Sequence, residues 1–182
     1  NLFPIDTNQA LLDLGPNRLY VGGNAVGSFA ALAGAQMSVG QLVAGFGGSG
    51  TGSVHVSGAN ALVQVGGSGR LDIGSWGTGS LNVSAGAIVD ATVNLADCAN
   101  PGVYCGNSIG NGAGSTANLL VTGAGSEVRA LGFFGVGNAQ VSTLAQGGFN
   151  FGTAGGTTVA EIKLLAGGSL RTGNTTIGQG AS

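Results

Sequence analysis

The two cysteines are the first residues whose type and spacing suggest chemistry. Cys98 and Cys105 stand close together in the segment Asp-Cys-Ala-Asn-Pro-Gly-Val-Tyr-Cys. An even number of cysteines in a short loop favours a disulfide in an extracellular protein. The chain-entropy model gives about 2.5 kcal/mol for closing a loop of this size. Zinc would need more ligands than two thiols, and the only histidine, His55, is far away in sequence. We therefore predict a Cys98–Cys105 disulfide and no metal site.

The loop that this disulfide would close has two interpretations. Loops on rigid scaffolds often carry binding, so it could be a recognition loop. It could equally be a tolerated surface insertion. We name Asn100 and Tyr104 in this loop, together with Trp76, as candidate binding residues.

The titratable residues give little sign of catalysis. His55 lies between Val54 and Val56, so if both valines face a core, the histidine points to solvent. A Ser-His-Asp arrangement would have to be assembled from this single histidine. Aligned repeats place Asp72 with Tyr20 and Thr176, without an acidic neighbour. The acidic residues are Asp6, Asp13, Asp72, Asp90, Asp97, Glu127 and Glu161. We expect no enzyme and no cofactor. A glycan-active enzyme is the weaker alternative, because it needs two carboxylates that meet in space.

Aromatic residues recur beside turn glycines. They are Phe46, Trp76 and the pair Phe133-Phe134. Stacked along one edge, they would form a packing ladder worth about 0.5–1.5 kcal/mol per pair. The alternative is a platform of rings for sugars.

Composition excludes several classes of protein. The 182 residues include 39 glycines, 43% are hydrophobic and only 7% are charged. This hydrophobic content is too high for an ordinary disordered tail, and glycine lacks the strict period of collagen. Glycine and polar residues interrupt every stretch long enough for a transmembrane helix. The net charge of −2 and the scattered basic residues argue against nucleic acid as a partner.

Internal repeats are the strongest signal in the sequence. Three pairs of segments match without gaps, at offsets of 52, 27 and 65 residues. These pairs are Arg18–Met37 with Arg70–Val89, Gly50–Ser57 with Gly77–Ser84, and Val56–Val63 with Val121–Val128. The period is therefore about 26 residues, paired into units of about 52, with one insertion.

Each repeat reads as short strands separated by tight turns. Val54–Val56, Leu71–Ile73 and Leu81–Val83 alternate apolar and polar residues with period two. Gly, Ser, Thr and Asn separate them, as turns require. The pattern predicts an all-β fold, a right-handed parallel β-helix (β-solenoid) of roughly seven coils. We assign residues 1–17 to a lead-in or cap and residues 18–182 to the repeats, with the Cys-bearing insertion at about 96–108. We expect the chain to be truncated at its C-terminus.

These repeats resemble a known family. Units of the form Leu-x-Val-Gly-x-x-Gly-x-Gly-x-Leu-x-Val-x-x-Gly-Ala-x-Val look like the autotransporter-associated β-helix repeat of type V secretion and PEP-CTERM-associated proteins. Leu71–Val89 and Val121–Val128 match best, and the resemblance covers about residues 18–96 and 109–182. It implies a secreted, surface-displayed bacterial passenger, often an adhesin, that a C-terminal translocator barrel anchors in the outer membrane. The Cys-bearing insertion and the first 16 residues depart from the pattern.

Two functions follow from this resemblance as expectations. One is adhesion or self-association, with a host or neighbouring-cell surface, glycans or another copy as partner. The other is a purely structural stalk that presents another domain. An ice-binding array is disfavoured, because the threonine pairs Thr157-Thr158 and Thr175-Thr176 do not recur in every repeat.

Overall fold

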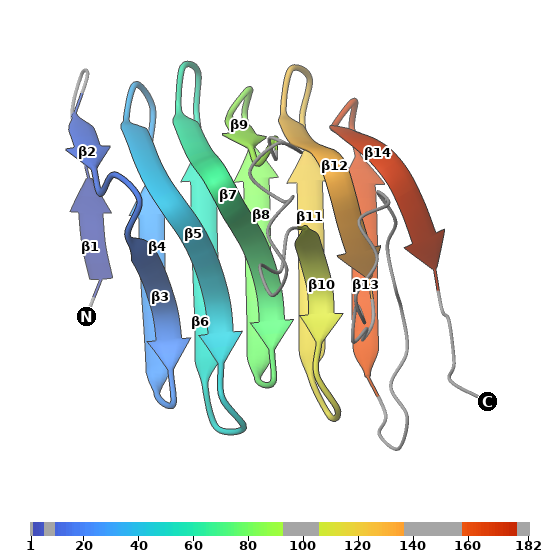
Figure 1. Ribbon diagram of the computed structural model, residues 1–182. Coiled ribbons are helices and arrows are strands. Elements are labelled where there is room, and N and C mark those ends of the chain that lie inside the picture. Colours follow the sequence, from blue (N-terminus) through green and yellow to red (C-terminus); the bar gives the residue numbers. More distant parts are fainter. Residues whose placement is uncertain (1, 6–9, 93–105, 137–157, 178–182) are drawn as a thin grey trace.

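The fold is built from strands alone. The computed structural model describes residues 2–5, 10–92, 106–136 and 158–177 (Figure 1). Every regular element among them is a β-strand, and the named strands pair in parallel. In the described part of the chain, no helix is long and apolar enough to cross a membrane. The predicted all-β, parallel character is confirmed.

The strands form two sheets. Sheet A has six strands, in the order β1-β4-β6-β8-β11-β13, and sheet B has eight. The strands of sheet A are β1 (Leu2–Ile5), β4 (Val26–Ala31), β6 (Thr51–Ser57), β8 (Thr78–Ser84), β11 (Thr116–Thr122) and β13 (Val159–Leu165). The strands of sheet B are β2 (Leu11–Asp13), β3 (Arg18–Gly23), β5 (Gln36–Phe46), β7 (Leu62–Ser75), β9 (Ile88–Asp90), β10 (Asn107–Asn111), β12 (Glu127–Val136) and β14 (Ser169–Ile177).

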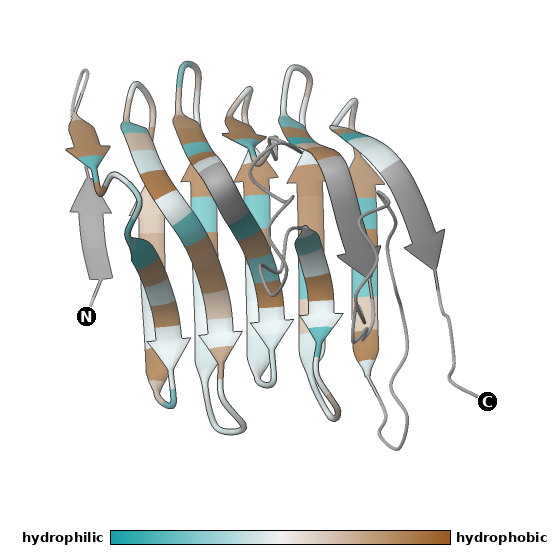
Figure 2. Ribbon diagram, viewed as in Figure 1, coloured by the Kyte–Doolittle hydropathy of each residue, from teal (hydrophilic) through white to brown (hydrophobic). Residues whose placement is uncertain are grey.

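The core lies between the sheets and is organised in columns. A column is the set of residues that occupy the same register position in successive strands. Two core columns of sheet A are Phe29–Val54–Leu81–Leu119 and Ala31–Val56–Val83–Val121, and none of these residues is more than 7% exposed. Apolar bands therefore recur at the same level of neighbouring strands (Figure 2). Each fully buried Val or Leu contributes about 1.5–3 kcal/mol.

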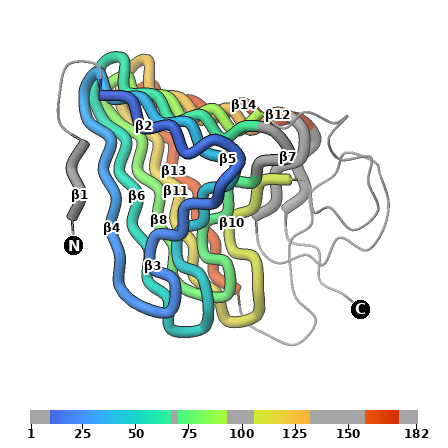
Figure 3. The backbone as a smooth tube through the Cα atoms, turned by 60° about the vertical axis from the view of Figure 1, so that its left-hand side comes forward, coloured from blue at the N-terminus to red at the C-terminus, as the bar shows by residue number. Residues whose placement is uncertain are grey.

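The chain passes from one sheet to the other after most strands. From β3 to β9 the strands alternate between sheet B and sheet A, so neighbours within a sheet come from successive passes. Figure 3 shows the result, with sheet A facing the curled sheet B. No strand can bury its apolar face alone, and the stack of passes supplies the missing partner.

The strand register confirms the internal repeats. Thr51–Ser57 pairs residue by residue with Thr78–Ser84, at the predicted offset of 27. Arg18 reaches Arg70 through Gln41, in steps of 23 and 29 residues that together give the offset of 52. Val56 reaches Val121 through Val83, which gives the offset of 65. Repeated segments are therefore neighbours in the stack.

Two strands lie in the segment that matches no repeat. β1 pairs with β4, with Pro4 opposite Ala30, and β2 pairs with β5. Both sheets thus begin before residue 18. Stacking requires only apolar residues at alternate positions, which Leu12 and Leu14 supply by packing against the core without any repeat signature.

Candidate functional site

Tight corners connect sheet B to sheet A. Each corner contains a glycine in the left-handed region, at φ between 70° and 76°: Gly22, Gly45, Gly74 and Gly110. At Gly45 an added Cβ would lie 2.0 Å from the carbonyl oxygen of Thr78 on the next pass. The backbone of one pass therefore touches the next at this corner, and only glycine fits.

Trp76 occupies an unusual position in one of these corners. It stands two residues after Gly74 and has a φ of 67°, whereas the equivalent positions hold Asn24, Gly47 and Gly112. A bulky residue in the left-handed region is a conformational outlier. The indole fits because the neighbouring residue is Gly112, whose Cβ would approach the Cδ2 atom of Trp76 to 2.7 Å. The Trp76 side chain nevertheless remains 51% exposed.

Two further aromatic residues lie beside Trp76. Phe46 forms an isolated backbone bridge with Trp76, and its ring centroid is 5.1 Å from that of Tyr20, at an interplanar angle of 57°. Tyr20 is 42% exposed and Phe46 is 39% exposed. Arg18 donates a hydrogen bond to the Tyr20 hydroxyl at 3.4 Å. We call Tyr20, Phe46 and Trp76 the aromatic corner.

The sequence located two of the three aromatic residues. Phe46 and Trp76 were expected together from their turn glycines, and the bridge brings them together. Tyr20 was missed because its register partner is Val43, not Phe46. The side chains of Phe133 and Phe134 lie outside the described residues.

The other binding candidates cannot be placed. Cys98, Cys105, Asn100 and Tyr104 all lie outside the described residues, and so does the predicted disulfide. Trp76 alone of the predicted binding residues has a described position, in the aromatic corner.

The strands that flank the insertion are described. Gln64 pairs with Asp90, and Asp72 pairs with Ser108. Between these pairs β7 advances by eight residues and its partner segment by eighteen, so the insertion adds ten. The strands β9 and β10 therefore lie one after the other along β7.

Asn107 joins the two sides of this break. Its Oδ1 atom accepts a hydrogen bond from the Leu71 N–H at 3.0 Å, and its Nδ2 group donates to the Ala91 carbonyl at 2.8 Å. The side chain is buried, at 2% exposed. Its amide thus satisfies a donor and an acceptor that the interrupted ladder leaves unpaired. No pattern in the sequence distinguishes Asn107 from the many turn asparagines.

Asp72 is a buried carboxylate on sheet B. The predicted column is confirmed, because the register runs from Tyr20 through Val43, Asp72, Ser108 and Gly135 to Thr176 without another acid. Asp72 is only 2% exposed. The Arg70 Nε group donates to it at 2.7 Å, and the Ser108 hydroxyl also donates to it.

Burial dominates the electrostatics of Asp72. Desolvation raises the pKa of this carboxyl above its ordinary value, and the Arg70 charge and the hydrogen bonds only partly oppose the rise. The neighbouring Val43 is buried as well, at 2% exposed, yet it is not part of the main core cluster. The face of sheet B that carries Val43 and Asp72 is therefore closed to solvent at this point.

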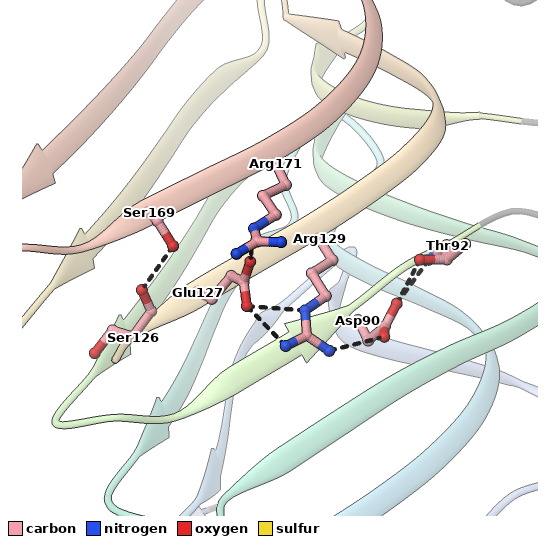
Figure 4. A network of polar contacts seen from close by, with 7 residues as sticks. All are labelled: Asp90, Thr92, Ser126, Glu127, Arg129, Ser169 and Arg171. Carbon is pink, nitrogen blue, oxygen red and sulfur yellow. Dashed lines mark hydrogen bonds and ion pairs between the residues drawn. The ribbon is translucent and has the colours of Figure 1, made fainter. Parts of the chain in front are cut away.

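A second polar network lies on β12 and its neighbours (Figure 4). The Arg129 Nε group donates to Glu127 Oε2 at 2.8 Å, and Arg171 Nε lies 2.5 Å from Glu127 Oε1. Asp90 lies on the other side of Arg129, at 3.6 Å. The hydrogen bond from Glu127 raises the pKa of the Arg129 guanidinium still further above its ordinary value.

These ion pairs determine what the carboxylates can do. Glu127 is 7% exposed and is contacted by two arginines, and Asp90 also accepts hydrogen bonds from Thr92. An arginine stabilises the ionised form of a carboxylate, which is the opposite of what a general acid requires. The arrangement therefore ties β9, β12 and β14 together.

His55 lies where its neighbours predicted. Val54 and Val56 are buried at 1% and 0% exposed, and His55 is partly exposed between them. Its register partners are Ala30 and Asn82, and Leu120 follows Asn82. The expected absence of a carboxylate beside this histidine in its column is confirmed.

Comparisons of the chain with models of protein families, with curated proteins and with solved structures found no match. The aromatic corner is therefore assessed on its own geometry. It combines three half-exposed rings, a strained tryptophan and a rigid backbone.

Proposed function

We propose that the chain is a β-solenoid segment, a right-handed parallel β-helix of about seven coils. Three features support this proposal: the parallel pairing, the alternation of strands between two sheets, and the columns of identical offset. Its role is to act as an adhesin or self-association module of a secreted, surface-displayed bacterial passenger of the autotransporter-associated repeat type. The resemblance of the repeats supports this setting.

The observation that carries adhesion is the aromatic corner. Half-exposed Tyr20, Phe46 and Trp76 come from three different strands of sheet B and form one apolar edge. Exposed aromatic patches mark interaction sites, because a ring offers a large contact area at little entropic cost. Strain at an exposed residue such as Trp76 is typical of functional positions.

Glycans on a host or neighbouring cell are the ligand class that fits best. Only 7% of the residues are charged, so recognition here cannot depend on many ion pairs. Ring faces bind the apolar faces of sugars, and tyrosine adds a hydroxyl for hydrogen bonding. The Tyr20 hydroxyl already accepts a hydrogen bond from Arg18, which orients it.

Surface display tests this function. The chain is fused to an autotransporter barrel on a non-adherent bacterium, and settling and attachment are compared with the barrel alone. We expect increased attachment with the wild-type chain, and a loss of at least about half of the increase with Trp76→Asn. Asparagine tolerates the left-handed region, as Asn24 does at the equivalent position, so the corner should still fold.

Leu131→Asn is the matched control, because Leu131 is 42% exposed but lies on β12, away from the corner. It should leave attachment unchanged. If the wild-type chain is displayed, as an antibody would establish, and adds no attachment, adhesion is contradicted. The alternative, a structural stalk that presents another domain, would then be favoured, and the continuous stack of core columns would suffice for it.

A further inference from the structure

One end of the stack leaves apolar core positions open. Among the described strands, β13 pairs only with β11 in sheet A, and β14 pairs only with β12 in sheet B. Val159, Leu164 and Leu165 on β13 are 54%, 46% and 52% exposed. An open parallel edge with apolar side chains is a template for further pairing.

These exposed residues continue the core columns. Leu164 follows Val121 in the column that contains Val56 and Val83, and Ile162 follows Leu119. In sheet B, Leu170 follows Val128 and packs only partly against the core. The exposed surface is thus a cross-section of the core, with the same side chains at the same spacing.

The opposite end of sheet B exposes the start of the same columns. β2 and β3 pair only with β5 among the described strands. Leu12 begins the column that Leu170 ends, and both are partly buried. Leu11, beside Leu12, is 71% exposed. Apolar positions therefore face outward at both ends of one column.

Opposite charges end a second column. The register runs without interruption through six residues: Asp13, Ser38, Gln64, Asp90, Arg129 and Arg171. Asp13 is exposed at the β2 end, and the Arg171 side chain is 71% exposed at the β14 end. Within the chain, the same column already places Arg129 against Asp90 at 3.6 Å.

We propose that the β14 end of one copy stacks on the β2–β3 end of a second copy, so that sheet B continues in parallel across the junction. Arg171 of one copy then lies one strand spacing, about 4.8 Å, from Asp13 of the next. Leu170 packs against Leu12, and β13 lies against β1. Pro4 in β1 has no N–H to donate, so sheet B and the core carry most of this junction.

The junction is heterologous, because it joins two different surfaces. It does not close on itself, so repeated stacking produces linear oligomers whose length grows with concentration. The inference gives the self-association part of the proposed function a geometry. It rests only on the strand register, so it is tested on the purified chain without any cell surface.

Sedimentation velocity from about 1 to about 200 µM covers the range in which micromolar association is seen. The wild-type chain should form a ladder of linear oligomers. Asp13→Arg and Arg171→Asp should each weaken association about tenfold or more, because like charges then meet at the junction. An equimolar mixture of the two variants should recover association, since each modified end meets its complement in the other variant.

Two controls keep the outcome interpretable. Lys163→Glu reverses an exposed charge on β13, whose column contains no acid, and should leave association within about twofold of wild type. Circular dichroism and thermal melting verify that each variant folds, which matters because Arg171 also pairs with Glu127. A monomeric wild-type chain at the highest concentration overturns the proposal. So does association that neither charge reversal weakens, or a mixture that stays dissociated. The adhesion assay is independent of all three results.

Discussion

At the corners between the sheets, the backbone of the next pass limits side-chain size. Gly45 has a φ of 72°, and its Cβ position lies 2.0 Å from the Thr78 carbonyl oxygen. Trp76 shows the contrasting case, in which a large side chain enters the left-handed region because Gly112 leaves room for the ring. Conformation and space act together at these positions.

Gly45→Ala should therefore destabilise the fold strongly. The methyl group would strain a left-handed residue and collide with backbone that cannot move independently of β8. We expect a loss of about 3 kcal/mol or more in the free energy of unfolding, measured by urea denaturation. Gly48→Ala is the matched control, because nothing lies within 4 Å of its Cβ position, and it should stay within about 0.5 kcal/mol of wild type. Equal effects of the two substitutions would contradict the close-approach argument.

The buried Asp72 predicts a pH dependence. Its folded-state pKa is raised above the ordinary 3.8 by burial, so the folded protein binds this proton more tightly than the unfolded chain does. Stability is therefore lost as the pH rises from about 3.8 through the raised pKa, by up to about 1.4 kcal/mol per pH unit. Asp72→Asn removes this titration. We expect the melting temperature of Asp72→Asn relative to wild type to rise across that window, whatever the constant cost of losing the Arg70 pair. Parallel curves would show that the carboxyl does not titrate there.

At the scale of elements, the sequence predicts the parts of the stack that repeat. The strands around Val54, Leu71 and Leu81 follow from period-two alternation, and their register follows from the offsets. Irregular steps were not predictable. Between Val39 and Gln41 on β5, β7 carries three extra residues, because Val65 and Arg70 are the partners. A few additional residues at a bulge change no composition and break no alternation, so sequence shows only the sum of the two steps.

The polar contacts that hold the elements together were also missed. The partners Glu127, Arg129 and Arg171 come from neighbouring strands, and each looks like an isolated surface charge in sequence. Tyr20 joins the aromatic corner across a register offset that the repeat alignment does not contain. Such contacts depend on which strands are adjacent, and adjacency is known only once the stack is built.

Asn107 tests the junction between β9 and β10. Asn107→Ala would leave the buried Leu71 N–H and the Ala91 carbonyl without partners. We expect a loss of about 2–4 kcal/mol in the free energy of unfolding, since each unsatisfied buried group costs about 1–3 kcal/mol. Asn118→Ala, at an exposed position on β11, should change stability by less than about 0.5 kcal/mol. A neutral Asn107→Ala would mean that water or another group replaces the amide.

At the scale of the whole molecule, stability depends on position along the stack. Each pass contacts only its neighbours, so central strands have two partners, whereas the strands at each end have one. β6 and β8 lie between paired strands, and their inward residues are at most 1% exposed, while three apolar residues of β13 are about half exposed. Opening should therefore begin at the ends and proceed inward.

Hydrogen exchange should reveal this gradient. At low protein concentration, where end-to-end stacking is absent, we expect amides of β6 and β8 to exchange at least about a hundredfold more slowly than those of β13. Raising the concentration should slow exchange in β13, β14 and β2 selectively, because stacking would cover those strands and leave the centre unchanged. Uniform protection along the chain would contradict a stack whose cohesion is local. A gradient that does not respond to concentration would support the local cohesion of the stack while arguing against contact between copies at its ends.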